Sequence, residues 1–126
     1  MIAEPGSAIA AVAWNGADSV ASNRILYPEA RATLAAAHRA KRIPTRSYAG
    51  RKTTLEELWH QMDIIEVTAS LAHAAGDLSE IHALRGYDAV HLAAALLIDA
   101  DALVSADNDL LTAAAAVGLP TVDVRA

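Results

Sequence analysis

Two short motifs in the second half of the sequence constrain the fold most. Residues 85–95 read Arg-Gly-Tyr-Asp-Ala-Val-His-Leu-Ala-Ala-Ala, which places Asp88 in the first turn of an apolar helix. Residues 103–107 read Leu-Val-Ser-Ala-Asp, an apolar strand that ends in Asp107 and leads into another helix. In a parallel α/β sheet such strand-to-helix junctions lie on one edge, where α/β folds bind ligands. We therefore expect the two carboxylates to meet at that edge.

The order of predicted elements indicates a single α/β domain that spans residues 1–126. Strands are expected at residues 19–25, 64–68, 102–105 and 120–124. Helices are expected at residues 4–14, 27–41, 53–62, 87–98 and 107–117, with two short helices around Gly76-Asp77. Strands that alternate with helices favour a parallel sheet covered by helices.

The composition excludes several classes of protein. The sequence has no Cys, which rules out disulfides and thiolate metal sites, and it has no Phe, so the core should be closely packed alanine-rich helices. Patterns typical of zincins, serine hydrolases and P-loop enzymes are absent. No signal peptide is recognised, and the apolar run at residues 89–98 is too short to span a bilayer. We expect a soluble cytoplasmic protein.

Charge is segregated along the chain, whose net charge is -5. Residues 24–52 carry eight basic side chains and a single acidic one, whereas residues 53–126 carry twelve acidic side chains and two arginines. Such segregation is either a contact surface for a polyanion or a solvated helix face with a surface loop.

Three acidic residues are candidate metal ligands. Taken singly, each has an ordinary explanation, because Asp107 suits a helix N-cap and Glu29 and Asp88 suit the first turn of a helix. In a parallel α/β architecture the N-termini of helices that follow strands point to the same sheet edge, so the three acids could converge there. Clustered carboxylates repel one another, and a hard cation such as Mg²⁺ or Mn²⁺ relieves that repulsion.

Three further residues are candidates for a supporting role beside these acids. His91 lies one turn beyond Asp88 and either forms a hydrogen bond near the site or is a satisfied core histidine. Asp109 either acts through a water molecule or is a simple helix-start charge. Ser105 lies two residues before Asp107.

The motifs resemble those of PIN-domain ribonucleases, in particular VapC-type toxins. Those proteins read D-A-x-H-x-A, then L-V-[ST]-x-D, then a helix and a short final strand. Residues 118–122 (Gly-Leu-Pro-Thr-Val) are also typical, and residues 22–32 are similar to the strand and helix that carry the family's Glu. The resemblance covers essentially the whole chain.

The resemblance implies a three-layer α/β/α fold and Mg²⁺- or Mn²⁺-dependent cleavage of RNA phosphodiester bonds. The metal ligands would be Glu29, Asp88 and Asp107. A homodimer and a cognate VapB-type antitoxin that blocks the site are also implied. The RNA contacts, which would position phosphates without reading sequence, would come from the basic stretch, namely Arg31, Arg39, Arg42, Arg46 and Arg51.

One departure from the family leaves a second hypothesis open. PIN domains begin with an apolar strand that ends in Asp-[ST]-[SA], whereas residues 3–7 of this sequence resemble the loop after that strand. We expect the first, central strand and its Asp to be missing, either through a misassigned start or in a truncated copy. The alternative function is therefore a catalytically inactive PIN remnant that binds RNA or antitoxin. A receiver-like phosphoacceptor domain is disfavoured. Such a domain needs paired acids after the first strand and a Lys after the last strand, and this sequence has neither.

Overall fold

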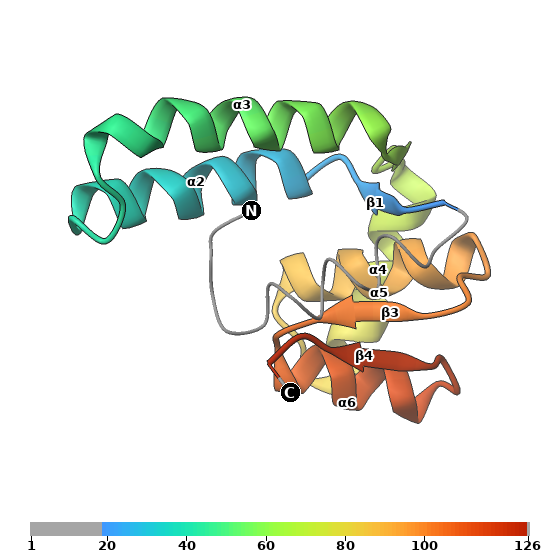
Figure 1. Ribbon diagram of the computed structural model, residues 1–126. Helices are drawn as coiled ribbons and strands as arrows, with labels where there is room; N and C mark the ends of the chain where they lie inside the picture. The colour runs from blue at the N-terminus through green and yellow to red at the C-terminus, as the bar shows by residue number, and fades with distance from the viewer. Residues whose placement is uncertain (1–18, 126) are drawn as a thin grey trace.

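The computed structural model describes residues 19–125, in which short strands are separated by one or two helices (Figure 1). In chain order they are β1 (Ala21–Asn23), α2 (Leu26–Arg39), α3 (Thr45–Gln61), β2 (Asp63–Ile65), α4 (Ala69–His82), α5 (Gly86–Leu97), β3 (Leu103–Ser105), α6 (Asn108–Ala116) and β4 (Thr121–Asp123). The helix expected at residues 4–14 lies outside the described residues. Within residues 19–125, no helix is both long and apolar enough to traverse a bilayer.

The strands form two parallel pairs. β1 pairs with β2, with Ser22 opposite Ile64, and β3 pairs with β4, with Val104 opposite Val122. Helices connect the two strands of each pair, as parallel pairing requires. The α/β class is therefore confirmed. In the described part of the chain no strand joins the two pairs, so the expected sheet is present in two pieces.

Two apolar clusters hold the described residues together. The larger cluster is built by α4, α5 and α6 with β3, and its buried members are Leu71, Ala75, Leu84, Ala89, Leu92, Ala93, Ala94, Leu103, Leu110, Ala113, Ala114 and Leu119. The smaller cluster joins α2 to α3 through Leu34, Ala37, Ile43 and Leu55. Half of the larger cluster is alanine, so its helices pack closely without a phenylalanine.

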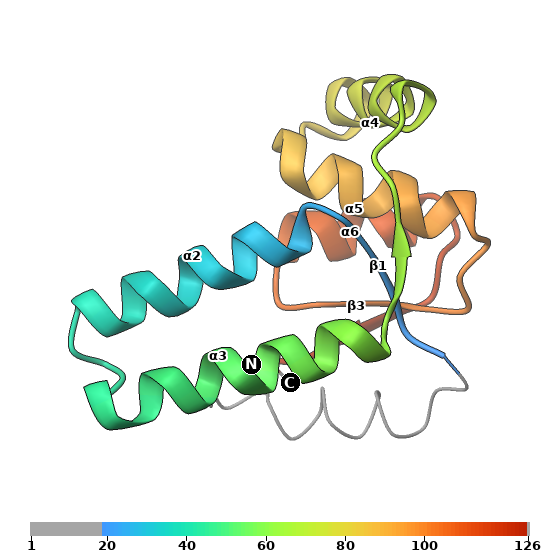
Figure 2. The ribbon, with the colours of Figure 1, turned by 90° about the horizontal axis from the view of Figure 1, so that it is seen from above.

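The helices α2 and α3 form a hairpin that projects from the rest of the molecule (Figures 1 and 2). Helix α5 contacts α4, α6 and β1, and it therefore links the two strand pairs. This central place of α5 matters because Asp88 lies in its first turn.

Two expected helix boundaries were wrong. Helix α3 begins at Thr45 rather than near residue 53, and the Thr54 hydroxyl donates to the Gly50 carbonyl, 3.1 Å away, instead of capping a helix start. Pro44 precedes the first helical turn in an extended conformation. A glycine inside a helix costs only about 1 kcal/mol relative to alanine, so Gly50 does not delay the start.

Helix α4 is also continuous through Gly76, where two short helices were expected. Leu71 and Ala75 are buried against the larger cluster and Leu78 packs on it, which offsets the cost of the glycine. The helix ends at Ala83 in a left-handed conformation, φ 54°. Gly118, at φ 82°, follows the end of α6 as predicted.

Candidate functional site

Asp88 is a buried carboxylate at the start of α5. Its residue is only 4% exposed, because α5 packs into the larger cluster directly behind it. Arg85, which precedes the helix in an extended conformation, donates from Nε to Asp88 Oδ2 over 3.2 Å. A buried carboxylate needs a countercharge or hydrogen bonds, and Arg85 supplies both.

The two carboxylate oxygens of Asp107 have different contacts. Oδ1 accepts a hydrogen bond from the Leu110 backbone N–H at 2.9 Å and caps α6. The Ser105 hydroxyl oxygen accepts from the Asp107 backbone N–H at 3.0 Å, which fixes the turn after β3. Oδ2 lies 3.5 Å from Arg85 Nη2. The predicted N-cap is thus present, and one oxygen remains for the cleft.

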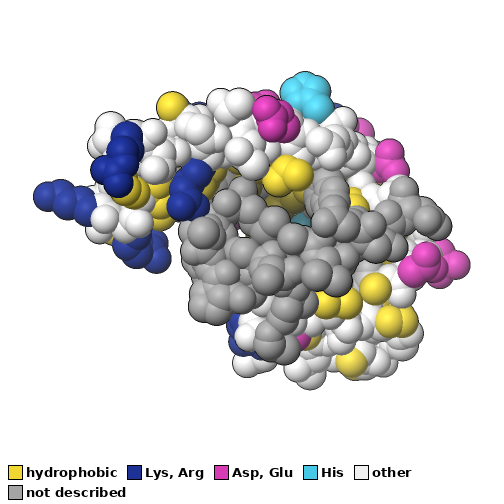
Figure 3. Space-filling view, in the orientation of Figure 1, with side chains coloured by type: hydrophobic (Ala, Val, Ile, Leu, Met, Phe, Trp, Pro, Cys, Tyr) yellow, Lys and Arg dark blue, Asp and Glu magenta, His cyan; other side chains and the backbone are white. Residues whose placement is uncertain are grey.

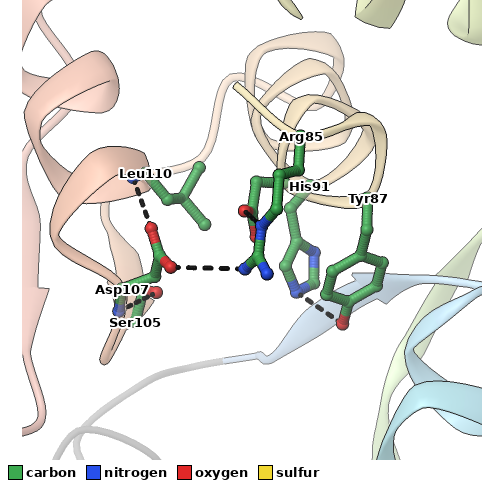
Figure 4. Close-up of polar contacts among 7 residues, drawn as sticks. Arg85, Tyr87, His91, Ser105, Asp107 and Leu110 are labelled. Carbon is green, nitrogen blue, oxygen red and sulfur yellow. Dashed lines mark hydrogen bonds and ion pairs between the residues drawn. The ribbon is translucent and has the colours of Figure 1, made fainter. Parts of the chain in front are cut away.

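Asp88 and Asp107 line the same cleft, which has a volume of about 440 Å³. The wall also includes Tyr87, His91, Ser105, Val104, Ala106 and Leu110. Figure 4 shows the Arg85 guanidinium reaching toward Asp107. The structure therefore brings together two of the three predicted carboxylates, with a guanidinium between them.

Glu29 does not line this cleft. It is exposed in the first turn of α2, as predicted, but no group of three Asp, Glu or His residues in the described part of the chain is arranged to hold a metal ion. Its charge does act on the cleft wall, because burial and then the charges of Glu29 and Asp88 raise the pKa of Tyr87 to about 12. Glu29 thus lies on the Tyr87 side of the site.

Two supporting candidates have different positions. Ser105 touches the backbone of Asp107. Asp109 is exposed in the first turn of α6 and outside the cleft lining, although its charge contributes to the raised pKa of Arg85 after the larger effects of Asp88 and Asp107.

His91 is held by a hydrogen-bonded chain that crosses from β1 to α5. The amide oxygen of Asn23 accepts from the Ile25 backbone N–H at 2.9 Å, which turns its Nδ2 toward His91 Nδ1 at 2.8 Å. His91 Nδ1 must then accept, so the imidazole proton is assigned to Nε2, which lies 3.4 Å from the Tyr87 hydroxyl. Burial lowers the pKa of His91, and the Asp88 charge opposes this only in part.

Sequence reasoning missed Arg85, Asn23 and Tyr87. Arg85 and Tyr87 lie inside the motif at residues 85–95, but their partners depend on tertiary structure. Asn23 gave no signal in the sequence, because its full burial and its partner His91 are visible only in the structure.

A second candidate surface lies on the α2–α3 hairpin. Arg39, Arg42 and Arg46 are exposed near the turn between the helices, and Lys and Arg side chains gather at that end in Figure 3. Tyr48 organises the same end, because His38 stacks on its ring at 4.2 Å and Lys52 Nζ lies 4.6 Å from the ring centroid. Arg31 and Arg51 are half-buried, and Arg31 donates to the Tyr27 hydroxyl at 2.8 Å.

A family model described as PIN domain matches residues 2–116. The chain belongs to the PIN-domain family. This PIN domain is 43% identical over 117 residues to Ribonuclease VapC45 of Mycobacterium tuberculosis (strain CDC 1551 / Oshkosh). It is equally similar to Ribonuclease VapC49 of Mycobacterium tuberculosis (strain ATCC 25618 / H37Rv), and both matches cover 91% of this chain and 81% of the relative. No solved structure matches it significantly.

PIN ribonucleases generally use divalent metal ions, and the cleft of this PIN domain fits such an ion in its donor chemistry. Asp88 and Asp107 present hard carboxylate oxygens, which Mg²⁺ and Mn²⁺ prefer. The Arg85 guanidinium already lies between the two carboxylates, so this position favours a cation.

Proposed function

We propose that this chain is a metal-dependent ribonuclease of the VapC toxin type, which cleaves RNA phosphodiester bonds with Mg²⁺ or Mn²⁺. The observation that carries the proposal is the pair of carboxylates, Asp88 and Asp107, that line one cleft. The positively charged Arg85 guanidinium lies between them. The two curated relatives are named ribonucleases, which supports RNA as the substrate class.

Each residue of the cleft has a definite part in this proposal. Asp88 and Asp107 would hold the metal ion. Glu29 would complete the set only if α2 brought its carboxylate closer to the cleft, which it does not line here. A bound Mg²⁺ or Mn²⁺ ion lowers the pKa of a water molecule and neutralises charge that develops on the phosphate. The α6 cap fixes the orientation of Asp107, and Tyr87 stays protonated as a neutral hydrogen-bond donor beside the phosphate.

The hairpin would supply the sequence-independent part of RNA binding. Its exposed arginines carry fixed positive charge, and such contacts position a phosphate backbone without reading bases. We assign RNA contacts to Arg39, Arg42 and Arg46 first, and to the half-buried Arg31 and Arg51 second.

The VapC resemblance also motivates a partner. We propose a homodimer in the cytoplasm and a VapB-type antitoxin that covers the cleft. Exposed apolar side chains at the end of α5 (Leu96, Leu97 and Ile98) offer surface for a second copy or for the antitoxin.

Substitution of the two cleft carboxylates tests the proposal. Asp88→Asn and Asp107→Asn should each abolish Mn²⁺ binding in calorimetry and cleavage of a fluorogenic RNA. The fold should persist, because Asn is also a good N-cap and is nearly isosteric with Asp. Asp101→Asn, an exposed carboxylate outside the cleft, is the matched control and should keep both activities. Unchanged Mn²⁺ affinity in both cleft variants would remove them from the metal site.

The second candidate function is an inactive PIN domain that binds RNA or antitoxin. The position of Glu29 outside the cleft favours it, because two carboxylates alone hold a metal weakly. Wild-type protein that binds labelled RNA but leaves it intact with Mg²⁺ and with Mn²⁺ would establish this alternative.

A further inference from the structure

The Arg85 guanidinium contacts both carboxylates that the proposed function assigns to a metal ion. Its Nε lies 3.2 Å from Asp88 Oδ2. Its Nη2 lies 3.5 Å from Asp107 Oδ2, and Figure 4 shows this second contact. One guanidinium therefore spans both candidate ligands. The backbone of Arg85 is set by the start of α5, but its side chain is 79% exposed and is free of the apolar core.

Competition between Arg85 and a metal follows from the oxygen atoms available. Asp107 Oδ1 is used by the Leu110 backbone N–H, so Oδ2 is the oxygen of Asp107 that faces the cleft. That oxygen is the one near Arg85. A carboxylate oxygen that accepts from a guanidinium is a poorer ligand for a metal in the same direction, and two cations in one small cleft repel each other.

We propose that Arg85 is an internal counter-cation, which holds Asp88 and Asp107 when no metal is bound and is displaced when a divalent ion enters. This inference rests on the proposed metal site. The displaced guanidinium remains at the mouth of the cleft, since Arg85 is anchored at the first turn of α5. It then binds a phosphate of the RNA, because a guanidinium binds phosphate oxygens bidentately. Metal loading therefore releases a positioning residue for the substrate.

A purely structural ion pair would have a different signature. Arg24 and Glu66 form such a pair, exposed on both sides and outside the cleft. Arg85 instead neutralises a buried carboxylate, so its removal leaves Asp88 beside Asp107 without a cation. The metal-free protein should be destabilised, and the metal should gain affinity because its competitor is gone.

The test compares Arg85→Gln with wild type and with Arg24→Gln as the matched control. Arg85→Gln should bind Mn²⁺ about threefold or more tightly in calorimetry, the size expected for removal of a partly exposed ion pair. It should also melt at a lower temperature without metal and show a larger rise with Mn²⁺. In saturating Mn²⁺ it should bind labelled single-stranded RNA more weakly. Arg24→Gln should leave the Mn²⁺ affinity unchanged.

Equal or weaker Mn²⁺ affinity in Arg85→Gln would overturn the competition, and unchanged RNA affinity would overturn the phosphate contact. If Arg85→Gln does not fold, Arg85→Lys keeps the charge without the planar fork and should still bind Mn²⁺ more tightly than wild type. Asp88→Asn separates this inference from the proposed function. Retained Mn²⁺ binding in Asp88→Asn would refute the metal site itself, whereas loss there with no change in Arg85→Gln refutes the role of Arg85 alone.

Discussion

The acidic cleft and the basic hairpin are held in opposite ways. Asp88 projects from α5, whose other side is buried in a cluster of twelve residues, and it is 4% exposed. The hairpin arginines lie on two helices and in the turn between them, and a buried cluster of four residues joins these helices. Close packing therefore holds Asp88, while a smaller cluster supports the hairpin arginines.

The difference matches what each kind of contact requires. A metal site depends on ligand positions to within about 0.5 Å, which only a well-packed scaffold maintains. Contacts to a phosphate backbone act mainly through charge and tolerate movement. A change in packing should therefore affect chemistry in the cleft region and leave RNA attraction by the hairpin largely intact.

Truncation of one core leucine in each region should show the difference between the two regions most clearly. Leu92→Ala removes a fully buried side chain one turn after Asp88 and should cost about 3–5 kcal/mol of unfolding free energy. Leu55→Ala, in the smaller cluster, should cost about 2–3 kcal/mol. Urea unfolding measures both losses. Only Leu92→Ala should also weaken Mn²⁺ binding, and an equal loss of Mn²⁺ affinity in Leu55→Ala would contradict the division into two regions.

Local features of the fold were predictable from the sequence, and features that depend on packing were not. Asp107 as an N-cap and Gly118 as a helix end follow from the conformations that a few neighbouring residues prefer. The start of α3 and the continuity of α4 through Gly76 were missed, because burial of one helix face outweighs a weak local preference.

The candidate site also has features that the sequence predicted and features that only the structure shows. The expectation that Asp88 and Asp107 lie together agrees with the structure, since both line one cleft. The junction argument holds for Asp107, which lies between β3 and α6, whereas Asp88 begins a helix that follows α4. The position of Arg85 between them depends on how two loops meet. The Asn23–His91 hydrogen bond joins residues 68 positions apart, a pairing that no local pattern encodes.

Removing positive charge from the hairpin tests whether this region attracts RNA independently of the cleft. The triple variant of Arg42, Arg46 and Arg51 to Gln should flatten the dependence of RNA affinity on salt by about 0.7 in the logarithmic slope for each phosphate that is no longer neutralised. Mn²⁺ affinity should stay the same. Fluorescence anisotropy at several salt concentrations measures the slope. A double variant of the ion-paired Arg24 and Arg125 is the control, and an equal flattening there would mean that net charge, not the hairpin, attracts RNA.

The smallest expected effect concerns His91, which links the first strand pair to the cleft. Burial lowers its pKa in the folded protein, so the unfolded chain binds this proton more readily. Stability from the neutral imidazole is therefore fully present above the unfolded pKa of about 6.5 and is lost as the pH falls below it. Protonation also breaks the hydrogen bond from Asn23, because His91 Nδ1 can no longer accept.

Urea unfolding between about pH 7 and pH 5, the range around the ordinary pKa of histidine, tests this assignment. The unfolding free energy of wild type should fall with pH, and His91→Asn should show a shallower fall, because it removes the titrating group while its side-chain oxygen can accept from Asn23. His73→Asn removes an exposed imidazole of α4 that does not line the cleft, and it serves as the matched control. Since His91 supports the wall of the cleft and lies outside the hairpin, RNA attraction should persist at the acidic end of this range while Mn²⁺ binding weakens. Parallel slopes for wild type and His91→Asn would mean that the imidazole does not contribute to the coupling between β1 and α5.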